Sequence, residues 1–136
     1  MNEYDPNGVS PSTPGAKLDA GKTPVARGCL HYFPRALKAV AEVSEVGANK
    51  YTWKGWETVP DGFTRYTDAM SRHLLAESSD GIWDDAPNGT GLLHAACVAW
   101  NALARLELLL REKQPDKRLT GHFEPESISH RGFQPQ

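Results

Sequence analysis

The sequence is poor in cysteine and has no marked excess of charge of either sign. Its 2 cysteines, Cys29 and Cys97, match no zinc-binding spacing and are too few for a disulfide framework. The net charge of −2, from 15 Lys+Arg and 17 Asp+Glu, offers no basic surface for a nucleic acid polymer or an anionic membrane. No apolar run is long enough to span a bilayer, and no segment has a signal-peptide layout. We therefore expect a cytoplasmic protein without nucleic acid or membrane partners, although a local basic pocket or a metal ion can still hold a free nucleotide.

The length of 136 residues, with 39% apolar and 24% charged residues, fits one globular domain. Residues 1–16 are rich in Pro, Ser, Asn and Gly, which predicts a flexible arm. Residues 17–113 form the predicted domain, whose first part, Lys17–Lys22, has no helical period and is expected to be extended or looped. Residues 114–136 contain three prolines and few apolar residues, which predicts a tail of loop or disorder.

Three helices are predicted within the domain. The first begins near Pro34, the second runs from a Thr64 N-cap to about Ser79, and the third runs from a Thr90 cap to Arg111. Few residues favour strands, so the predicted fold class is all-α, an antiparallel helical bundle. The third helix is apolar on all sides. A short fourth helix or a partner subunit is therefore expected to cover it, and we expect a homo-oligomer, dimer or tetramer.

Two pairs of acidic residues are the main candidates for a metal-binding site. Glu42-x-x-Glu45 lies on the first predicted helix and Glu77-x-x-Asp80 on the second, and a spacing of three places each pair on one helix face. Antiparallel packing of these helices would gather four carboxylates, which repel one another unless a cation is bound. Ligation by oxygen alone favours Mg²⁺ or Mn²⁺.

Each polar group also has a structural interpretation. The first pair lies on a polar stripe that any amphipathic helix turns toward water, whereas Glu77 and His73 lie on the apolar side of the second helix. A charge there is costly unless it is paired or metal-bound, so Glu77 is the stronger candidate. His94, Asn101 and Arg105 follow one line of the third helix. They suit phosphates or a sugar hydroxyl, or they pair with carboxylates of neighbouring helices.

Four further blocks accompany the acidic pairs: Lys17-Leu-Asp-Ala-Gly-Lys22, Gly47-Ala-Asn-Lys-Tyr51, Asp68-Ala-Met-Ser-Arg-His73, and Gly91-Leu-Leu-His-Ala-Ala96 continuing to Asn101. With the acidic motif, this order of blocks resembles the all-α nucleoside triphosphate pyrophosphohydrolases of the MazG-like superfamily. It is most similar to the phage dATP/dGTP diphosphohydrolase (MazZ-like) branch. The resemblance covers about residues 17–111.

The resemblance implies hydrolysis of dGTP or dATP to the monophosphate and pyrophosphate, with Mg²⁺ or Mn²⁺ as cofactor. It also implies an oligomer whose subunits share the bundle core. In phages of this branch the dGMP formed serves genomes that contain 2-aminoadenine, and the location would then be the host cytoplasm. The family often has a further Glu where this chain has Ala41, which implies one carboxylate fewer.

On this interpretation Glu42, Glu45 and Glu77 are catalytic, and together with Asp80 they hold the metal; one of the glutamates is the general base. The predicted substrate-binding residues are Lys22, Lys50, Tyr51, His73, His94, Asn101 and Arg105. Two alternatives stay open. One is a pyrophosphohydrolase for pyrimidine or damaged nucleotides. The other is a non-catalytic helical interaction module, in which the acidic residues only pair with Arg105 and Lys38.

Overall fold

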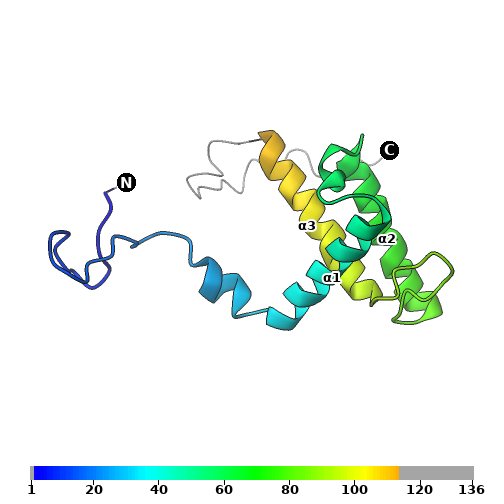
Figure 1. Cartoon of the computed structure of the whole chain (residues 1–136), viewed down its shortest axis with the longest axis horizontal. Helices are drawn as coiled ribbons and strands as arrows, with labels where there is room; N and C mark the ends of the chain where they lie inside the picture. Colours follow the sequence, from blue (N-terminus) through cyan, green and yellow to red (C-terminus); the bar gives the residue numbers. More distant parts are fainter. Residues whose placement is uncertain (1, 114–136) are drawn as a thin grey trace.

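The computed structural model describes residues 2–113, in which the regular structure is helical apart from one isolated β-bridge (Figure 1). The elements are a π-helical turn η1 (Ala26–Leu30), α1 (Pro34–Lys50), a 3-10 turn η2 (Gly55–Thr58), α2 (Gly62–Asp80) and α3 (His94–Lys113). The prediction of an all-α fold is confirmed. The predicted tail, residues 114–136, lies outside the described residues.

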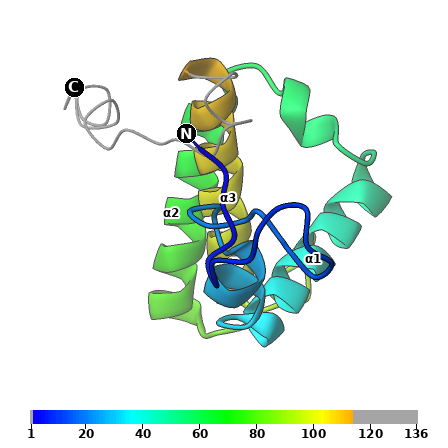
Figure 2. The ribbon, with the colours of Figure 1, turned by 90° about the vertical axis from the view of Figure 1, so that its left-hand side faces the viewer.

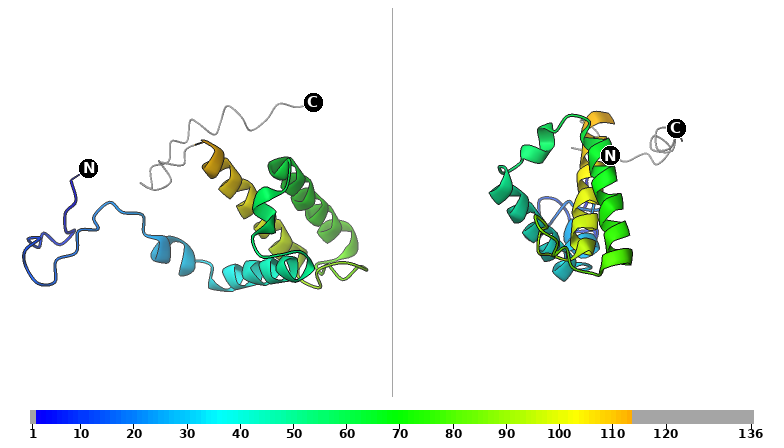
Figure 3. Two further views of the ribbon diagram at one scale, coloured as in Figure 1. Left: turned by 45° about the horizontal axis from the view of Figure 1, so that its top comes forward. Right: turned by 90° about the vertical axis from the view of Figure 1, so that its right-hand side faces the viewer.

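The helix α3 lies between α1 and α2 (Figures 2 and 3). The helices α2 and α3 run antiparallel along most of their length, and α1 crosses the other side of α3 with a smaller contact. The predicted direct packing of the first helix against the second is therefore wrong for a single chain, because the apolar third helix occupies the space between them.

The packed core is small and lies where α1 meets α3. Its buried side chains include Val43, Ala96 and Cys97, and Cys97 is only 1% exposed. On α3, by contrast, Leu103 and Leu106 are 48% and 44% exposed. A single chain therefore leaves part of this apolar helix uncovered.

Indole and phenol rings from η2, α2 and α3 form a cluster that is hydrogen-bonded to α1. The ring centroids of Trp56 and Tyr66 lie 6.1 and 5.6 Å from that of Trp100, both in edge-to-face geometry. The Trp100 Nε1–H donates a hydrogen bond of 2.9 Å to Ser44 Oγ on α1. Edge-to-face pairs add to the free energy of burial, and the hydrogen bond leaves the indole N–H paired inside the cluster. This cluster is the main polar and aromatic link between α1 and the rest of the fold.

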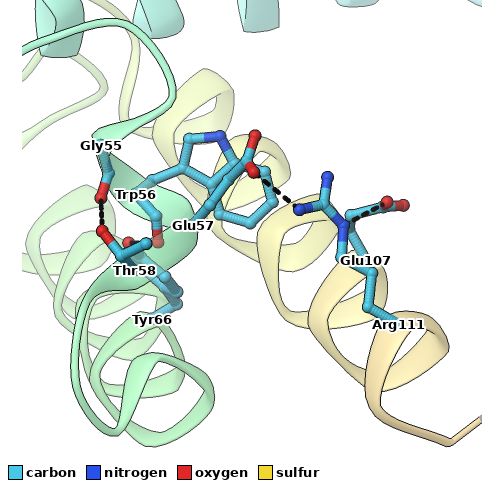
Figure 4. A network of polar contacts seen from close by, with 7 residues as sticks. All are labelled: Gly55, Trp56, Glu57, Thr58, Tyr66, Glu107 and Arg111. Atoms are coloured by element: carbon cyan, nitrogen blue, oxygen red, sulfur yellow. Dashed lines mark hydrogen bonds and ion pairs between the residues drawn. The ribbon is translucent and has the colours of Figure 1, made fainter.

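The turn η2 is held against the ends of α2 and α3 (Figure 4). Tyr66 Oη donates to the Trp56 carbonyl oxygen at 2.7 Å. Arg111 pairs with Glu57 at 2.9 Å and with Glu107 at 2.8 Å, and its guanidinium lies 5.3 Å from the centre of the Trp56 ring. These contacts attach the connection between α1 and α2 to the C-terminal end of α3.

The helix boundaries confirm one predicted start and correct two. The helix α1 begins at Pro34, as predicted. The helix α2 begins at Gly62, before the predicted Thr64 cap, and a Cβ at this buried glycine would lie 3.1 Å from Leu108 Cδ1. The helix α3 begins at His94 instead of directly after Thr90. Thr90 does not cap it, because the Thr90 hydroxyl is engaged within the preceding loop.

The N-terminal segment projects away from the helices and folds on itself (Figure 1). Asp5 organises it, because its two carboxylate oxygens accept hydrogen bonds of 2.7 Å from the backbone N–H groups of Asn7 and Lys17. The Ala20 N–H donates to the Tyr4 carbonyl at 3.1 Å. Lys17–Lys22 contains no helix, as predicted.

Candidate active site and metal centre

Two imidazoles and a carboxylate meet beside the start of α3. His73 comes from the middle of α2, Asp84 from the loop between α2 and α3, and His94 is the first residue of α3. One ligand atom from each lies within 4.8 Å of the others. His73 Nδ1 and His94 Nδ1 are 3.0 Å apart, so without a bound cation one must carry the proton and donate it to the other. Within residues 2–113 no other group of three His, Cys, Asp or Glu side chains is arranged in this way.

The loop between α2 and α3 is closed by its own backbone. Trp83 and Leu93 form the isolated antiparallel bridge, the Asp84 N–H donates to the Leu92 carbonyl at 2.8 Å, and the Gly91 N–H donates to the Asp84 carbonyl at 2.8 Å. Asp84 Oδ2 also accepts bonds from the N–H and the hydroxyl of Thr90, at 2.8 and 2.9 Å. The carboxylate is therefore held by one oxygen. This explains why Thr90 does not cap α3.

Gly89 is required at the tip of this loop. The chain turns at Asn88, which has a φ of 69°, and the Gly89 N–H then donates to the Ala86 carbonyl at 2.8 Å. A Cβ on Gly89 would lie 2.5 Å from the Asp84 carbonyl oxygen and 2.8 Å from Asp84 Oδ1. No side chain fits in that space, so a glycine at this position allows Asp84 to take its observed place.

The surroundings favour a neutral His73 and an ionised Asp84. Burial lowers the pKa of His73, and the neighbouring His94 and Arg72 lower it further, against the opposing effect of Asp84. Burial acts to raise the pKa of Asp84, but the Thr90 hydrogen bonds and the two imidazoles together hold it below its ordinary value. A neutral imidazole and a carboxylate are the protonation states that bind metal ions.

The predicted carboxylate cluster is not assembled within one chain. Glu42, Glu45 and Asp80 are exposed and Glu77 is half-buried, and α3 separates the first pair from the second (Figure 2). These four residues contribute to no group of three close ligand atoms within the described residues. Glu77 lies one helical turn beyond His73 on α2.

Comparison with known families identifies the chain. The model of the dATP/dGTP diphosphohydrolase N-terminal domain matches residues 12–118, most of the sequence. The chain belongs to this dATP/dGTP diphosphohydrolase family. It is accordingly a nucleoside triphosphate pyrophosphohydrolase, which confirms the resemblance to dATP/dGTP diphosphohydrolases seen in the sequence. No curated protein and no solved structure gave a significant match. In the described part of this family member, no helix has both the length and the apolarity to cross a membrane.

Three of the predicted substrate-binding residues lie on the surface of this diphosphohydrolase family member. Lys22 forms an exposed ion pair of 2.9 Å with Glu3 in the N-terminal segment. At the end of α1, Lys50 Nζ lies 5.5 Å from the centre of the Tyr51 ring, and Tyr51 is 76% exposed. Lys50 and Tyr51 therefore present a cation and an aromatic face side by side and open to solvent.

Asn101 and Arg105 are engaged inside the helix pair. Asn101 is buried and donates through Nδ2 to the Cys97 carbonyl at 2.8 Å. Arg105 Nε donates to Thr67 Oγ1 at 2.6 Å, and its guanidinium lies 4.6 Å from the centre of the Phe63 ring. These two residues thus contact a carbonyl, a hydroxyl and a ring, instead of the carboxylates expected if they only pair with neighbouring helices.

The structure adds Asp84, which the sequence analysis did not select. His73 and His94 were candidates separately, as substrate-binding residues, and the structure brings them into one group with this loop carboxylate. A signal was available in Asp84-Asp-Ala-Pro-Asn-Gly-Thr90, because Pro-Asn-Gly favours a tight turn. Such a turn brings its flanking residues together, and here it pairs Asp84 with Thr90.

Proposed function

We propose that the chain hydrolyses purine deoxynucleoside triphosphates, dGTP and dATP, to the monophosphate and pyrophosphate with Mg²⁺ or Mn²⁺ as cofactor. The observation that carries this proposal is the family match over residues 12–118, which includes every predicted site residue from Lys22 to Arg105. From the resemblance alone we also propose that the chain is encoded by a phage and that the dGMP formed supplies DNA containing 2-aminoadenine.

The acidic residues suit a hard divalent cation. Mg²⁺ is usually held in proteins by one or two carboxylates, with water and substrate phosphates as its other ligands. Glu77 and Asp80, three residues apart on α2, are sufficient for this, and Glu42 and Glu45 form the equivalent pair on α1. When bound, the metal supplies charge neutralisation of the triphosphate and a bound water of lowered pKa. In this proposal one of the glutamates would serve as the general base for the attacking water.

The end of α1 is the proposed contact for the nucleotide. Lys50 is placed to bind phosphate oxygens, and the exposed ring of Tyr51 offers a face on which a purine can stack. A purine covers more of that face than a pyrimidine. Lys22 and Arg105 are proposed as further phosphate-binding residues. For Arg105 this requires exchange of the Thr67 hydroxyl for a phosphate oxygen, which a guanidinium binds more strongly.

We further propose a homo-oligomer, dimer or tetramer. An apolar groove of about 310 Å³ lies between α1 and α3, and the half-exposed Leu103 and Leu106 line it together with Trp100. A second copy would cover this surface and could bring another α1 toward α2. Light scattering over a range of concentrations tests this, and a stable, active monomer would contradict it.

A panel of substrates tests the proposed reaction. Purified protein is incubated with dGTP, dATP, dCTP or dTTP and with Mg²⁺, Mn²⁺ or EDTA, and pyrophosphate release is measured. Release from dGTP and dATP that EDTA abolishes is expected. If dCTP, dTTP or an oxidised nucleotide were the best substrate, the alternative specificity would hold. Absence of turnover under all conditions would favour the non-catalytic interaction module.

A further inference from the structure

We propose that His73, Asp84 and His94 form a cation site of their own, which takes a transition-metal ion of the Zn²⁺ class. It differs in chemistry from the oxygen-only Mg²⁺ or Mn²⁺ site proposed for the glutamates. The proposal does not depend on which nucleotide is the substrate, because it rests on the geometry and donor atoms of the three side chains.

The distance between the two imidazoles fits a shared ion. Zinc–nitrogen bonds of about 2.0–2.1 Å at a tetrahedral angle place two nitrogen ligands roughly 3.3 Å apart. The observed separation of His73 Nδ1 and His94 Nδ1 is 3.0 Å, and a carboxylate oxygen of Asp84 lies within the same 4.8 Å group. The two imidazole nitrogens therefore need to move apart by only a few tenths of an ångström to share an ion.

The donor atoms select the class of ion. Two imidazole nitrogens and one carboxylate oxygen suit Zn²⁺, Co²⁺ and Ni²⁺, whereas Mg²⁺ prefers oxygen ligands and retains its water. Three protein ligands leave a fourth position of a tetrahedral ion for water or another small ligand.

The protein holds the three ligands in place before any ion binds. His94 is 5% exposed, and its backbone N–H donates to the Ile82 carbonyl at 2.9 Å. The two Thr90 bonds to Asp84 Oδ2 orient the carboxylate, as second-layer hydrogen bonds commonly do in metal sites. An ion bound here would join α2, the loop and α3, and it should raise the stability of the native chain by mass action.

The competing explanation is a proton in place of the ion. One imidazole N–H donating to the other imidazole nitrogen gives the same 3.0 Å separation without any metal. The two explanations differ in what they predict for added metal, because a hydrogen-bonded pair gives no specific, saturable binding.

The test is a titration of untagged, metal-free, full-length protein with Co²⁺, followed by visible absorption and by competition with Zn²⁺. We expect an absorption band typical of tetrahedral Co²⁺ that saturates at one ion per chain. Zn²⁺ should abolish this band, and millimolar Mg²⁺ should not. Zn²⁺ should also raise the melting temperature. A wild-type chain without a saturable band and without a Zn²⁺-dependent shift would overturn the proposal, whatever the variants do.

Matched variants locate the site. Asp84→Asn and His73→Gln should weaken Co²⁺ binding on the order of a hundredfold or more. The controls Asp85→Asn and His31→Gln, in exposed residues outside the group, should leave it unchanged. Circular dichroism checks that each variant is folded. Equal Co²⁺ binding by folded Asp84→Asn and Asp85→Asn chains would contradict the assignment. Hydrolysis of dGTP with Mg²⁺ is measured separately, so loss of the proposed function with retention of the Co²⁺ band distinguishes the two proposals.

Discussion

The two sides of α3 differ in how firmly they hold their polar side chains. On the α2 side, a loop closed by its own hydrogen bonds presents Asp84 to two imidazoles, one of which is buried. On the α1 side, Glu42, Glu45 and Lys50 are exposed. The difference indicates that the His–Asp–His group is preorganised in a single chain, whereas Glu42 and Glu45 join no such group within the described residues.

The two sides differ in how they are attached to α3, and this explains the contrast. The α2–α3 loop spans residues 81–93, and its Asn-Gly turn, its β-bridge and the Thr90 bonds leave it few alternative conformations. The helix α1 is joined to α3 mainly through the Trp100–Ser44 hydrogen bond and a small apolar contact. Few buried contacts mean low local stability, which is common for elements that bind substrate.

The largest expected effect is that of Glu77→Gln on turnover. Loss of a metal ligand should cost several kcal/mol of transition-state stabilisation, or about three orders of magnitude in rate. The melting temperature should stay the same or rise, because a half-buried charge is removed. Pyrophosphate release and thermal melting measured on one preparation test this, with Asp68→Asn on the exposed side of α2 as the control. Near-normal turnover of Glu77→Gln would refute the role of this glutamate in metal binding.

Gly89→Ala should disrupt the α2–α3 loop and the His–Asp–His group that it helps to form. The added Cβ would meet the Asp84 carbonyl at 2.5 Å, so the loop must move and Asp84 must leave its position. We expect a loss of about 2 kcal/mol in the free energy of unfolding and weaker Co²⁺ binding. Gly47→Ala in α1 is the control, since a Cβ there meets nothing within 4 Å. In a helix this change should be neutral or stabilising by about 0.5–1 kcal/mol. Equal effects of the two variants in denaturant titrations would contradict the contrast between the loop and α1.

Much of the fold could be predicted from local sequence signals. The wrong start of α3 and the missed Asp84 both arise in the loop between α2 and α3. Pro34 set the start of α1, and the apolar third segment predicted a central helix that one chain does not cover. The start of α3 was wrong because Thr90 resembles an N-cap but its hydroxyl bonds to Asp84. Asp84 was missed because no regular spacing relates it to His73 or His94, and only the folded loop brings the three together.

Ser44→Ala should weaken the attachment of α1 to α3 and lower the free energy of unfolding by a smaller amount. It removes the acceptor of the Trp100 Nε1–H bond, and the loss of one such bond costs about 1 kcal/mol. Chemical denaturation measures this loss. Ser71→Ala on the surface of α2 is the control, because its hydroxyl bonds only to the Thr67 carbonyl of its own helix. If Ser44→Ala were as stable as the control, the Trp100 link would not hold α1 in place.

The smallest expected effect is a dependence of stability on pH that arises from the titration of His73. Its folded-state pKa lies below the ordinary value of 6.5, so the unfolded chain binds the proton more readily. This contribution to stability is present above pH 6.5 and is lost as the pH falls through the folded-state pKa. For Asp84, with a pKa below 3.8, the corresponding loss occurs only in stronger acid. Melting in EDTA between about pH 7.5 and pH 5 should show a decrease that His73→Gln reduces and His31→Gln does not. An unchanged slope in His73→Gln would assign the dependence to other groups.

The identity of the products formed from dGTP tests the central claim most directly. Wild-type protein with Mn²⁺ is incubated with dGTP, and nucleotide and phosphate products are separated by chromatography and quantified. We predict dGMP and pyrophosphate in equal amounts, because the chain belongs to a diphosphohydrolase family, and this activity cleaves between the α- and β-phosphates. Formation of dGDP with orthophosphate, or of deoxyguanosine with triphosphate, would contradict the proposed reaction.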